Sequence, residues 1–315
     1  MAGNRVALAL GSGGARGYAH IGVIDELRHR GYEIVGIAGS SMGALVGGLQ
    51  AAGRLDEFAD WAKSLTQRAV LRLLDPSISA AGVLRAEKIL DAVRDILGEV
   101  TIEELPIPYT AVSTDLLSGK SVWLQRGPVD AAIRASIAIP GVITPHVFGG
   151  RLLADGGILD PLPMAPIAAV NADLTIAVSL AGSEAGGRYE PTDTEPRATT
   201  EWLSRMWRST TALFESSRSV APPDETLGAE DLVEASREDV APKLGSFEVM
   251  NRTIDIAQAA LARHTLAAYP PDVLIEVPRS ACRSLEFHRA AEVIDIGRQL
   301  AATVLDELEK PTPES

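Results

Sequence analysis

The sequence predicts an α/β fold of three layers, in which helices cover both faces of a mainly parallel central sheet. Strand-like and helix-like patterns alternate from residue 5 to residue 52, and such alternation is typical of parallel strands joined by crossover helices. The composition agrees, because aromatic residues make up only 4% and hydrophobic residues 46% of the chain. Buried parallel strands are short aliphatic runs of this kind.

Two strand–loop–helix units begin the chain. RVALAL at 5–10 predicts a buried strand, and apolar residues at three-residue steps predict a helix over 18–30. Residues 32–38 predict a second strand, and residues 42–52 predict a second helix. Parallel strands are therefore expected to lie side by side, with a connecting loop at the carboxyl end of each.

The alternation continues through most of the chain. Further helices are expected over 54–74, 85–97 and 129–136. Further strands are expected over 106–114, 121–124, 151–154 and 173–180. Strand and helix patterns return over 250–306. We therefore expect a single domain over residues 1–315.

A segment of different composition interrupts the pattern at about 181–247. Residues 181–200 are rich in Gly, Glu, Thr and Pro, and residues 221–242 hold seven acidic side chains, one basic one and three prolines. Both stretches predict solvated, mobile connections. Between them, residues 202–219 have two tryptophans and three arginines broadly at helical spacing. This helix either contacts a membrane surface or acts as a lid, or it packs on the core or a subunit interface.

Charge and cysteine content exclude several classes of partner. The net charge of −13 argues against nucleic acid, which needs clustered Lys and Arg. The one cysteine, Cys282, allows no internal disulfide and is typical of a reducing compartment. We find no signal-peptide pattern and no apolar run of about 18 residues. A cytoplasmic protein that can be peripheral at the membrane is expected.

The stretch IAGSSMGAL at 37–45 raises the question of a nucleophile. It contains Gly39-x-Ser41-x-Gly43 between the second predicted strand and its helix. A serine hydroxyl becomes a good nucleophile when a base takes its proton, and a sharp strand-to-helix turn exposes its oxygen above the sheet. Two interpretations stay open from these residues: a nucleophilic serine, or a tight connection with no chemical role.

The glycine cluster GSGGARG at 11–17 lies between the first predicted strand and its helix. Free amides at a helix start bind anions, so this loop suits either a phosphate or the oxyanion formed in ester hydrolysis. A dinucleotide fingerprint needs glycine at position 16 and an acidic residue after the second strand. Arg16 and Ser41 do not fit it, and no P-loop Gly-Lys follows. The sequence favours an oxyanion hole over a nucleotide site, and a turn without a ligand stays open.

A third motif, Asp155-Gly156-Gly157, follows the strand expected over 151–154. An aspartate held there can accept a serine proton, although an ordinary carboxyl pKa of about 3.9 makes it a weak base. Burial and hydrogen bonding would have to compensate for that weakness. Taken alone, the motif is typical of a turn.

In this order, the three motifs resemble those of the patatin-like phospholipase family, especially short bacterial members related to the catalytic domain of neuropathy target esterase. STDLLSGK at 113–120, RASIAIPGVITPHVFGGRLLADGGILDPLP at 134–163 and the segment over 271–297 are similar as well. The resemblance covers about residues 5–180 and 250–305. It implies a patatin-like three-layer fold and a phospholipase or lysophospholipase-type esterase without metal or cofactor.

The resemblance also implies a Ser–Asp dyad with no catalytic histidine. Ser41 matches the nucleophile, Asp155 matches the base, and the amides of Gly13 and Gly14 match the oxyanion hole. The residues that support these loops are Gly11, Arg16, Gly39, Gly43, Gly156 and Gly157. Asp155 would take the Ser41 proton during attack on an acyl ester, and water would then hydrolyse the acyl-enzyme. One departure is Asp160, where many members have Asn.

Other functions stay open at this point. A Ser–His–Asp triad in the order of the α/β-hydrolases would need His264 or His288, both expected on C-terminal helices. A non-catalytic lipid-binding or regulatory protein could have the same fold, and a nucleotide-binding enzyme fits less well. The sequence leaves open the acyl chain, the head group and the oligomeric state.

Overall fold

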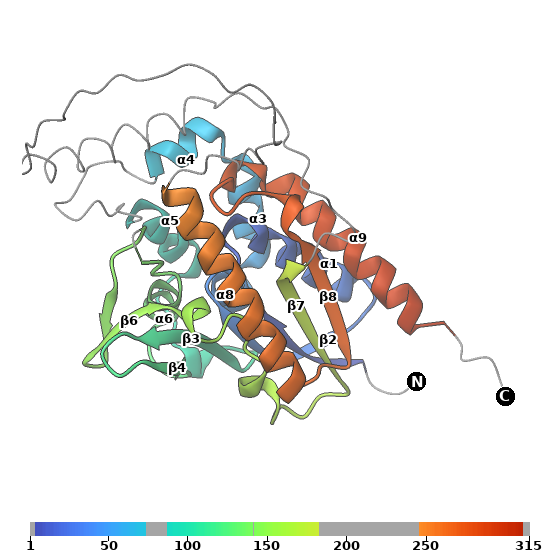
Figure 1. Cartoon of the computed structure of the whole chain (residues 1–315). Coiled ribbons are helices and arrows are strands. Elements are labelled where there is room, and N and C mark those ends of the chain that lie inside the picture. The colour runs from blue at the N-terminus through green and yellow to red at the C-terminus, as the bar shows by residue number, and fades with distance from the viewer. Residues whose placement is uncertain (1–3, 74–86, 141, 183–245, 311–315) are drawn as a thin grey trace, which may run out of the picture. The chain divides into compact units, whose positions relative to one another are not determined.

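The computed structural model describes residues 4–73, 87–140, 142–182 and 246–310 (Figure 1). The chain divides into two compact units, one of residues 1–185 with 254–315 and the other of residues 186–253. The description below concerns the first unit. The insertion predicted at about 181–247 lies almost wholly outside the described residues, and the helix predicted at 202–219 lies wholly outside them. Both therefore stay predictions.

The described strands form one mixed sheet. In chain order they are β1 (Arg5–Leu10), β2 (Glu33–Ser40), β3 (Tyr109–Asp115), β4 (Lys120–Leu124), β5 (His146–Phe148), β6 (Arg151–Asp155), β7 (Leu174–Gly182) and β8 (Val273–Pro278). Strands β3, β2, β1, β7 and β8 are neighbours in that order and run parallel, while β4, β6 and β5 add antiparallel pairings at the β3 side. The predicted α/β class is confirmed.

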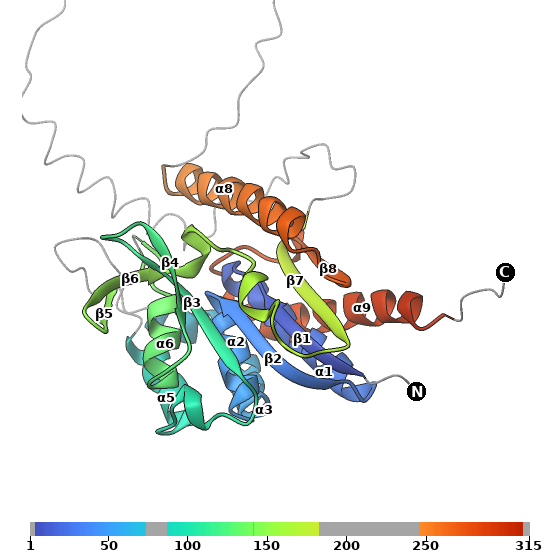
Figure 2. The same ribbon diagram turned by 90° about the horizontal axis from the view of Figure 1, so that it is seen from below.

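Helices lie on both faces of this sheet (Figure 2). They are α1 (Ala19–His29), α2 (Met42–Ala51), α3 (Leu55–Ser64), α4 (Gln67–Leu73), α5 (Glu87–Leu97), α6 (Val129–Ser136), α8 (Ser246–Ala268) and α9 (Ala290–Leu308). The helix predicted over 54–74 is in fact two, because Leu65 has an extended backbone (ψ 115°) that ends α3. The strand predicted from 106 begins at Tyr109, since Pro106 and Pro108 have no N–H to donate.

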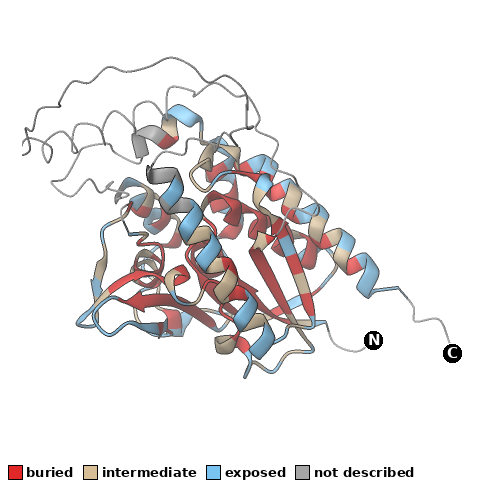
Figure 3. Ribbon diagram, in the orientation of Figure 1, coloured by how far each residue is buried: buried red, intermediate tan, exposed pale blue. Residues whose placement is uncertain are grey.

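The parallel strands are largely buried (Figure 3), and the size of their residues differs between the two faces. The face toward α1, α2 and α9 presents large side chains such as Leu8, Leu10 and Val178. The face toward α8 presents alanines, including Ala7 and Ala9, against Leu162, Met164 and Ala262. Both faces are buried, which explains why these strands are continuous apolar runs.

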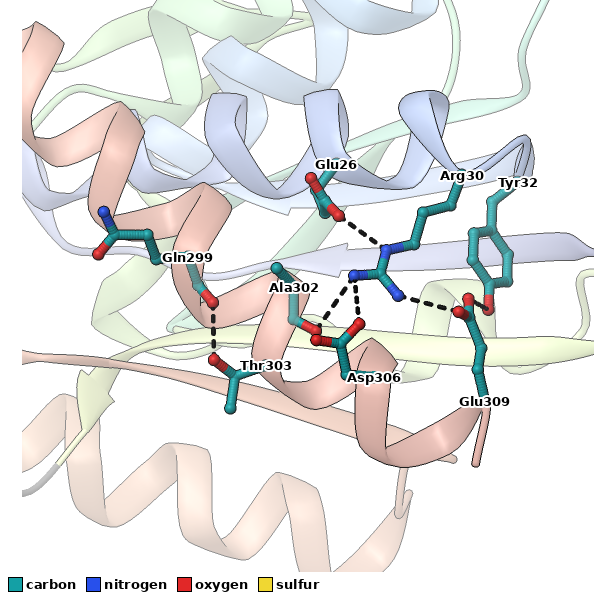
Figure 4. Close-up of polar contacts among 8 residues, drawn as sticks. All are labelled: Glu26, Arg30, Tyr32, Gln299, Ala302, Thr303, Asp306 and Glu309. Atoms are coloured by element: carbon teal, nitrogen blue, oxygen red, sulfur yellow. Dashed lines mark hydrogen bonds and ion pairs between the residues drawn. The ribbon is translucent and has the colours of Figure 1, made fainter. Parts of the chain in front are cut away.

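A charged cluster joins the ends of α1 and α9 (Figure 4). Arg30 donates hydrogen bonds to Glu26, Asp306 and Glu309 at 2.7, 2.7 and 2.9 Å. The hydroxyl of Tyr32 donates to the same Glu309 at 3.0 Å. Every carboxylate in the cluster has a donor, so the cluster fastens α9 to the end of α1 and to Tyr32, just before β2.

The register of β3 brings two other strand ends together. Strand β4 pairs with 111–115 along one edge of β3, so β2 and β6 must share the other edge. Ser40, the last residue of β2, lies opposite Val112, and Asp155, the last residue of β6, lies opposite Ser113. Because β2 and β6 run in opposite directions, their carboxyl ends meet there.

Candidate active site

Ser41 lies at a strained turn between β2 and α2. Its backbone has φ 55° and ψ −122°, and among the described residues it is the one non-glycine residue with positive φ. The turn needs glycine on both sides: a Cβ atom on Gly39 would lie 2.2 Å from the Gly43 oxygen, and one on Gly43 would lie 2.0 Å from the Leu10 oxygen. Such strain persists only where the surroundings enforce it.

Ser136, the last residue of α6, holds this turn in place. The backbone N–H of Ser41 donates to the Ser136 hydroxyl at 2.9 Å, and that hydroxyl donates to the Val112 carbonyl at 2.6 Å. Ser136 is completely buried. The strained amide therefore has an acceptor, and an unsatisfied buried amide is avoided.

The Ser41 hydroxyl donates to the Asp155 carboxylate, with 2.6 Å between Oγ and Oδ2. The other carboxylate oxygen accepts the N–H of Gly157 at 2.7 Å. Asp155 is only 3% exposed, and this burial raises its pKa from 3.8 to about 6, although the hydrogen bonds from Ser41 and Gly157 oppose the rise. A carboxylate of that pKa is ionised at neutral pH and is a stronger base than an ordinary aspartate.

The glycine loop passes beside Ser41 and continues into a short 3₁₀ helix, Gly14–Tyr18. Its flanking amides are occupied: Ser12 donates to Pro161 and Ala15 donates to Ser284. Within the described residues, the amides of Gly13 and Gly14 donate no hydrogen bond. Two adjacent free donors can bind a negatively charged oxygen.

An apolar pocket opens in front of this loop. It contains about 780 Å³ of empty space, part of it open to solvent, and Gly14 and Ser41 both line it. Most of its other walls are aliphatic or aromatic side chains, including Tyr18, Leu45, Phe58, Trp61, Ile139 and Phe287. A wall of this composition can hold an apolar group and exclude water.

A second cavity, whose walls hold both polar and apolar residues, lies behind the loop. Ser12, Arg16, Asp255, Gln258 and Arg279 line it, and none of them lines the apolar pocket. Arg16 donates to the Gly13 carbonyl at 3.2 Å and to Asp255 at 3.0 Å. The loop therefore separates the apolar pocket from a second cavity that holds charged and polar side chains.

Among the described residues, no histidine is hydrogen-bonded to Ser41 or Asp155. His20 is completely buried and donates from Nε2 to the Gly11 carbonyl at 2.8 Å, and burial lowers its pKa to about 4. His264 is exposed on α8. The prediction of His288 on a helix is corrected, because it lies on a 3₁₀ turn, Phe287–Arg289, ahead of α9. The Ser41 hydroxyl has Asp155 as its hydrogen-bond partner.

The remaining predicted residues surround this arrangement. Gly156 begins a 3₁₀ turn after Asp155, and its carbonyl accepts the N–H of Asp160 at 2.9 Å. Burial raises the pKa of Asp160 to about 6. Across the described ranges, no group of three His, Cys, Asp or Glu side chains is arranged to hold a metal ion. In those same ranges, no helix is long and apolar enough to cross a membrane.

Ser136 and Asp255 are among the residues of the site that were not predicted. Ser136 lies within the quoted RASIAIP segment, where a serine between apolar residues was a usable signal. Asp255 is 239 positions from its partner Arg16, and nothing in the sequence pairs them.

The chain is similar to a family model, to other proteins in sequence and to a solved structure. A family model described as patatin-like phospholipase matches residues 8–168. An uncharacterised NTE family protein of Mycobacterium tuberculosis is 69% identical over 341 residues, which cover 99% of this chain and 94% of that protein. Neuropathy target esterase sws of Drosophila grimshawi is 33% identical over 170 residues, which cover 52% of this chain and 12% of that protein. The solved structure of VipD from Legionella pneumophila matches with a TM-score of 0.44 and 17% identity, over 96% of this chain and 66% of VipD.

Proposed function

Since this chain belongs to the patatin-like phospholipase family, we propose that it is a serine esterase that hydrolyses lipid-like acyl esters through Ser41 and Asp155. Membership of this family supports a hydrolase. The catalytic residues and the class of substrate are what we propose. The observation that carries it is the 2.6 Å hydrogen bond from Ser41 to Asp155 at the wall of an apolar pocket. A structural serine would not need a strained backbone there.

The chemistry proceeds in two steps. The Ser41 oxygen attacks the ester carbonyl carbon while Asp155 takes its proton, and the amides of Gly13 and Gly14 stabilise the oxyanion. The C–O bond to the alcohol then breaks, and that alcohol leaves with the proton from Asp155. In the second step Asp155 takes a proton from water as the water attacks the acyl carbon. The bond from that carbon to the Ser41 oxygen then breaks, the fatty acid leaves, and Asp155 returns the proton to the Ser41 oxygen.

The apolar pocket supports a lipid-like acyl group. Phe58 and Trp61 on α3 face the same space as Leu45 on α2, so an acyl chain bound there would be removed from water. Burial of each methylene stabilises binding by about 0.8 kcal/mol. An acyl chain in this pocket places its carbonyl beside Ser41 and the free amide of Gly14.

Covalent labelling tests the proposal. A fluorophosphonate probe is applied to the wild type, Ser41→Ala, Asp155→Asn and Ser40→Ala, with peptide mass mapping, in the presence and absence of detergent micelles. We expect label on Ser41 in the wild type and in Ser40→Ala, none in Ser41→Ala, and strongly slowed labelling in Asp155→Asn. Ser40 is the matched control because it is also buried and precedes Ser41 directly. A folded wild type that takes no label under either condition would overturn the proposal.

A further inference from the structure

The orientation of the peptide between Gly13 and Gly14 is set from behind the loop. Arg16 Nε donates to the Gly13 carbonyl oxygen at 3.2 Å. In a trans peptide the C=O and the N–H point in opposite directions, and the described chain has no cis peptide. Because the Gly13 oxygen points toward Arg16, the Gly14 N–H points away from Arg16, and Gly14 lines the apolar pocket together with Ser41.

Arg16 is itself held by helix α8. Its Nη2 donates to Asp255 Oδ1 at 3.0 Å and makes a longer contact of 3.5 Å with the Ser284 hydroxyl. The Arg16 side chain is 5% exposed and that of Asp255 is 27% exposed. Arg279 donates to the backbone carbonyl of Asp255 at 3.2 Å, which fixes this turn of α8. Asp255 is the carboxylate that balances the buried charge of Arg16, and the ion pair is partly shielded from water.

We propose that Asp255 is a positioning residue of the oxyanion loop and acts through Arg16. The ion pair holds the guanidinium where it binds the Gly13 oxygen, and this keeps the Gly14 N–H directed at the oxyanion position before substrate arrives. The effect on catalysis rests on the function proposed above. Asp255 lies outside the matched family region of residues 8–168, so this support comes from the C-terminal part of the chain.

A positioning role predicts a specific kinetic change. The Gly14 amide interacts with the oxygen most strongly when that oxygen becomes negative, so loss of its alignment lowers kcat with little change in KM. Removal of one oxyanion donor lowers kcat by about 100- to 1,000-fold. A donor that is misaligned but still present should lower kcat by only part of that factor. We expect Asp255→Ala to lower kcat at least about tenfold, with KM within about twofold of wild type.

A double-mutant cycle shows whether Asp255 acts through Arg16. Wild type, Arg16→Met, Asp255→Ala and the double variant are assayed with p-nitrophenyl butyrate, and each melting temperature is recorded. In the Arg16→Met background, Asp255→Ala is expected to cost less than about twofold in kcat, because the residue it acts through is gone. Additive effects in the cycle would overturn the proposal.

Asp25→Asn is the matched control for loss of an ion pair. Asp25 pairs with Arg298 at 3.2 Å and its side chain is 26% exposed, close to the value for Asp255, but the pair joins α1 to α9. We expect it to leave kcat unchanged. An equal fall of kcat in Asp25→Asn and Asp255→Ala would overturn the specific role of Asp255.

An NMR measurement separates this proposal from the proposed function. With ¹⁵N-glycine labelling, Asp255→Ala is expected to shift or broaden the amide signals of Gly13 and Gly14, while Asp25→Asn leaves them in place. Asp255→Glu, which keeps the carboxylate, is expected to restore part of the wild-type signal. These signals report the loop even in a protein that hydrolyses nothing. Unchanged signals in Asp255→Ala would overturn the positioning role, whereas changed signals in an inactive wild type would overturn only the proposed function.

Discussion

The glycine loop at residues 11–17 has two unlike sides. In front of it lies the apolar pocket that Gly14 lines, and the amides of Gly13 and Gly14 donate no hydrogen bond within the described chain. Behind it, Arg16 bonds to the Gly13 carbonyl and to Asp255, and Ser12 approaches Gln258 at 3.4 Å. The loop amides thus have no hydrogen-bond partner within the described chain, whereas the polar groups behind the loop are hydrogen-bonded to one another.

This difference shows how a site can keep unsatisfied groups in a fixed place. A buried amide without an acceptor costs free energy, and a loop free to move would turn it toward water or another carbonyl. The hydrogen bonds behind the loop oppose that movement. A similar division holds at the turn of Ser41, where Ser136 satisfies the strained amide and leaves the hydroxyl for Asp155. Changes at the front should therefore abolish the chemistry, and changes at the supports should weaken it.

The largest effect is expected from Asp155→Asn, which acts on the front. Without a carboxylate to take the Ser41 proton, kcat should fall on the order of 1,000-fold or more. Stability should change in the opposite direction. The pKa of the Asp155 carboxyl is about 6 in the folded protein and about 3.9 in an unfolded chain. Between those pH values the folded state holds a proton that the unfolded state has released, so the free energy of unfolding falls as pH rises.

Above that window the ionised Asp155 costs about 3 kcal/mol, at about 1.4 kcal/mol for each pKa unit. Asp155→Asn removes this cost, so its melting temperature should exceed the wild-type value at pH 8, with no gain below pH 4. Asp160→Asn is the control, because burial raises the pKa of Asp160 to about 6 as well. It should change stability over the same range while kcat is kept. A less stable Asp155→Asn at pH 8 would contradict this account.

Ser136→Ala is expected to have an intermediate effect, because it removes a support of the turn. It leaves the Ser41 amide buried without an acceptor, at a cost of about 1–3 kcal/mol in the free energy of unfolding. As the strained turn relaxes, kcat should fall about 10- to 100-fold. Urea unfolding and p-nitrophenyl butyrate hydrolysis measure the two quantities.

Ser113→Ala is the matched control for Ser136→Ala. Ser113 is also completely buried, but its hydroxyl has no hydrogen-bond partner among the described residues. Its removal should therefore leave kcat near the wild-type value. If both variants lose the same activity, the hydrogen bond from Ser41 to Ser136 has no special role.

The smallest effect is expected for each methylene added to an acyl chain in the apolar pocket. Each added methylene buried there should raise kcat/KM about fourfold, the equivalent of about 0.8 kcal/mol. A series of p-nitrophenyl esters from butyrate to octanoate measures the gradient below the micelle-forming concentration. Leu45→Ser is expected to reduce the gradient because Leu45 lines the pocket. A series that is flat in the wild type would mean that the acyl chain binds elsewhere.

Much of the fold follows from local sequence patterns. The strands β1, β2 and β7 are short aliphatic runs, and the loops after β1 and β2 are marked by glycine and serine. The break between α3 and α4 was missed because Leu65 and its neighbours keep a helix-like apolar pattern. The 3₁₀ turn before α1 was missed because the apolar steps continue through Tyr18.

The site could be predicted only as separate motifs. Ser41 and Asp155 are 114 positions apart, and their contact depends on β2 and β6 sharing one edge of β3. That register is set by pairings of strands far apart in the chain, which a single sequence does not display. The same reason explains why Asp255 was missed, since its role depends on where α8 crosses the sheet and not on its neighbours.

The most direct test of the central claim is the pH dependence of fluorophosphonate labelling at Ser41. The claim is that Asp155, with a pKa of about 6, is the base that activates Ser41. The labelling rate should rise tenfold per pH unit below about 6 and reach a plateau above it. In Asp155→Asn this rise should be absent and the rate low throughout. A wild-type rate that keeps the same pH profile after Asp155→Asn would contradict the account, because another group would then be the base.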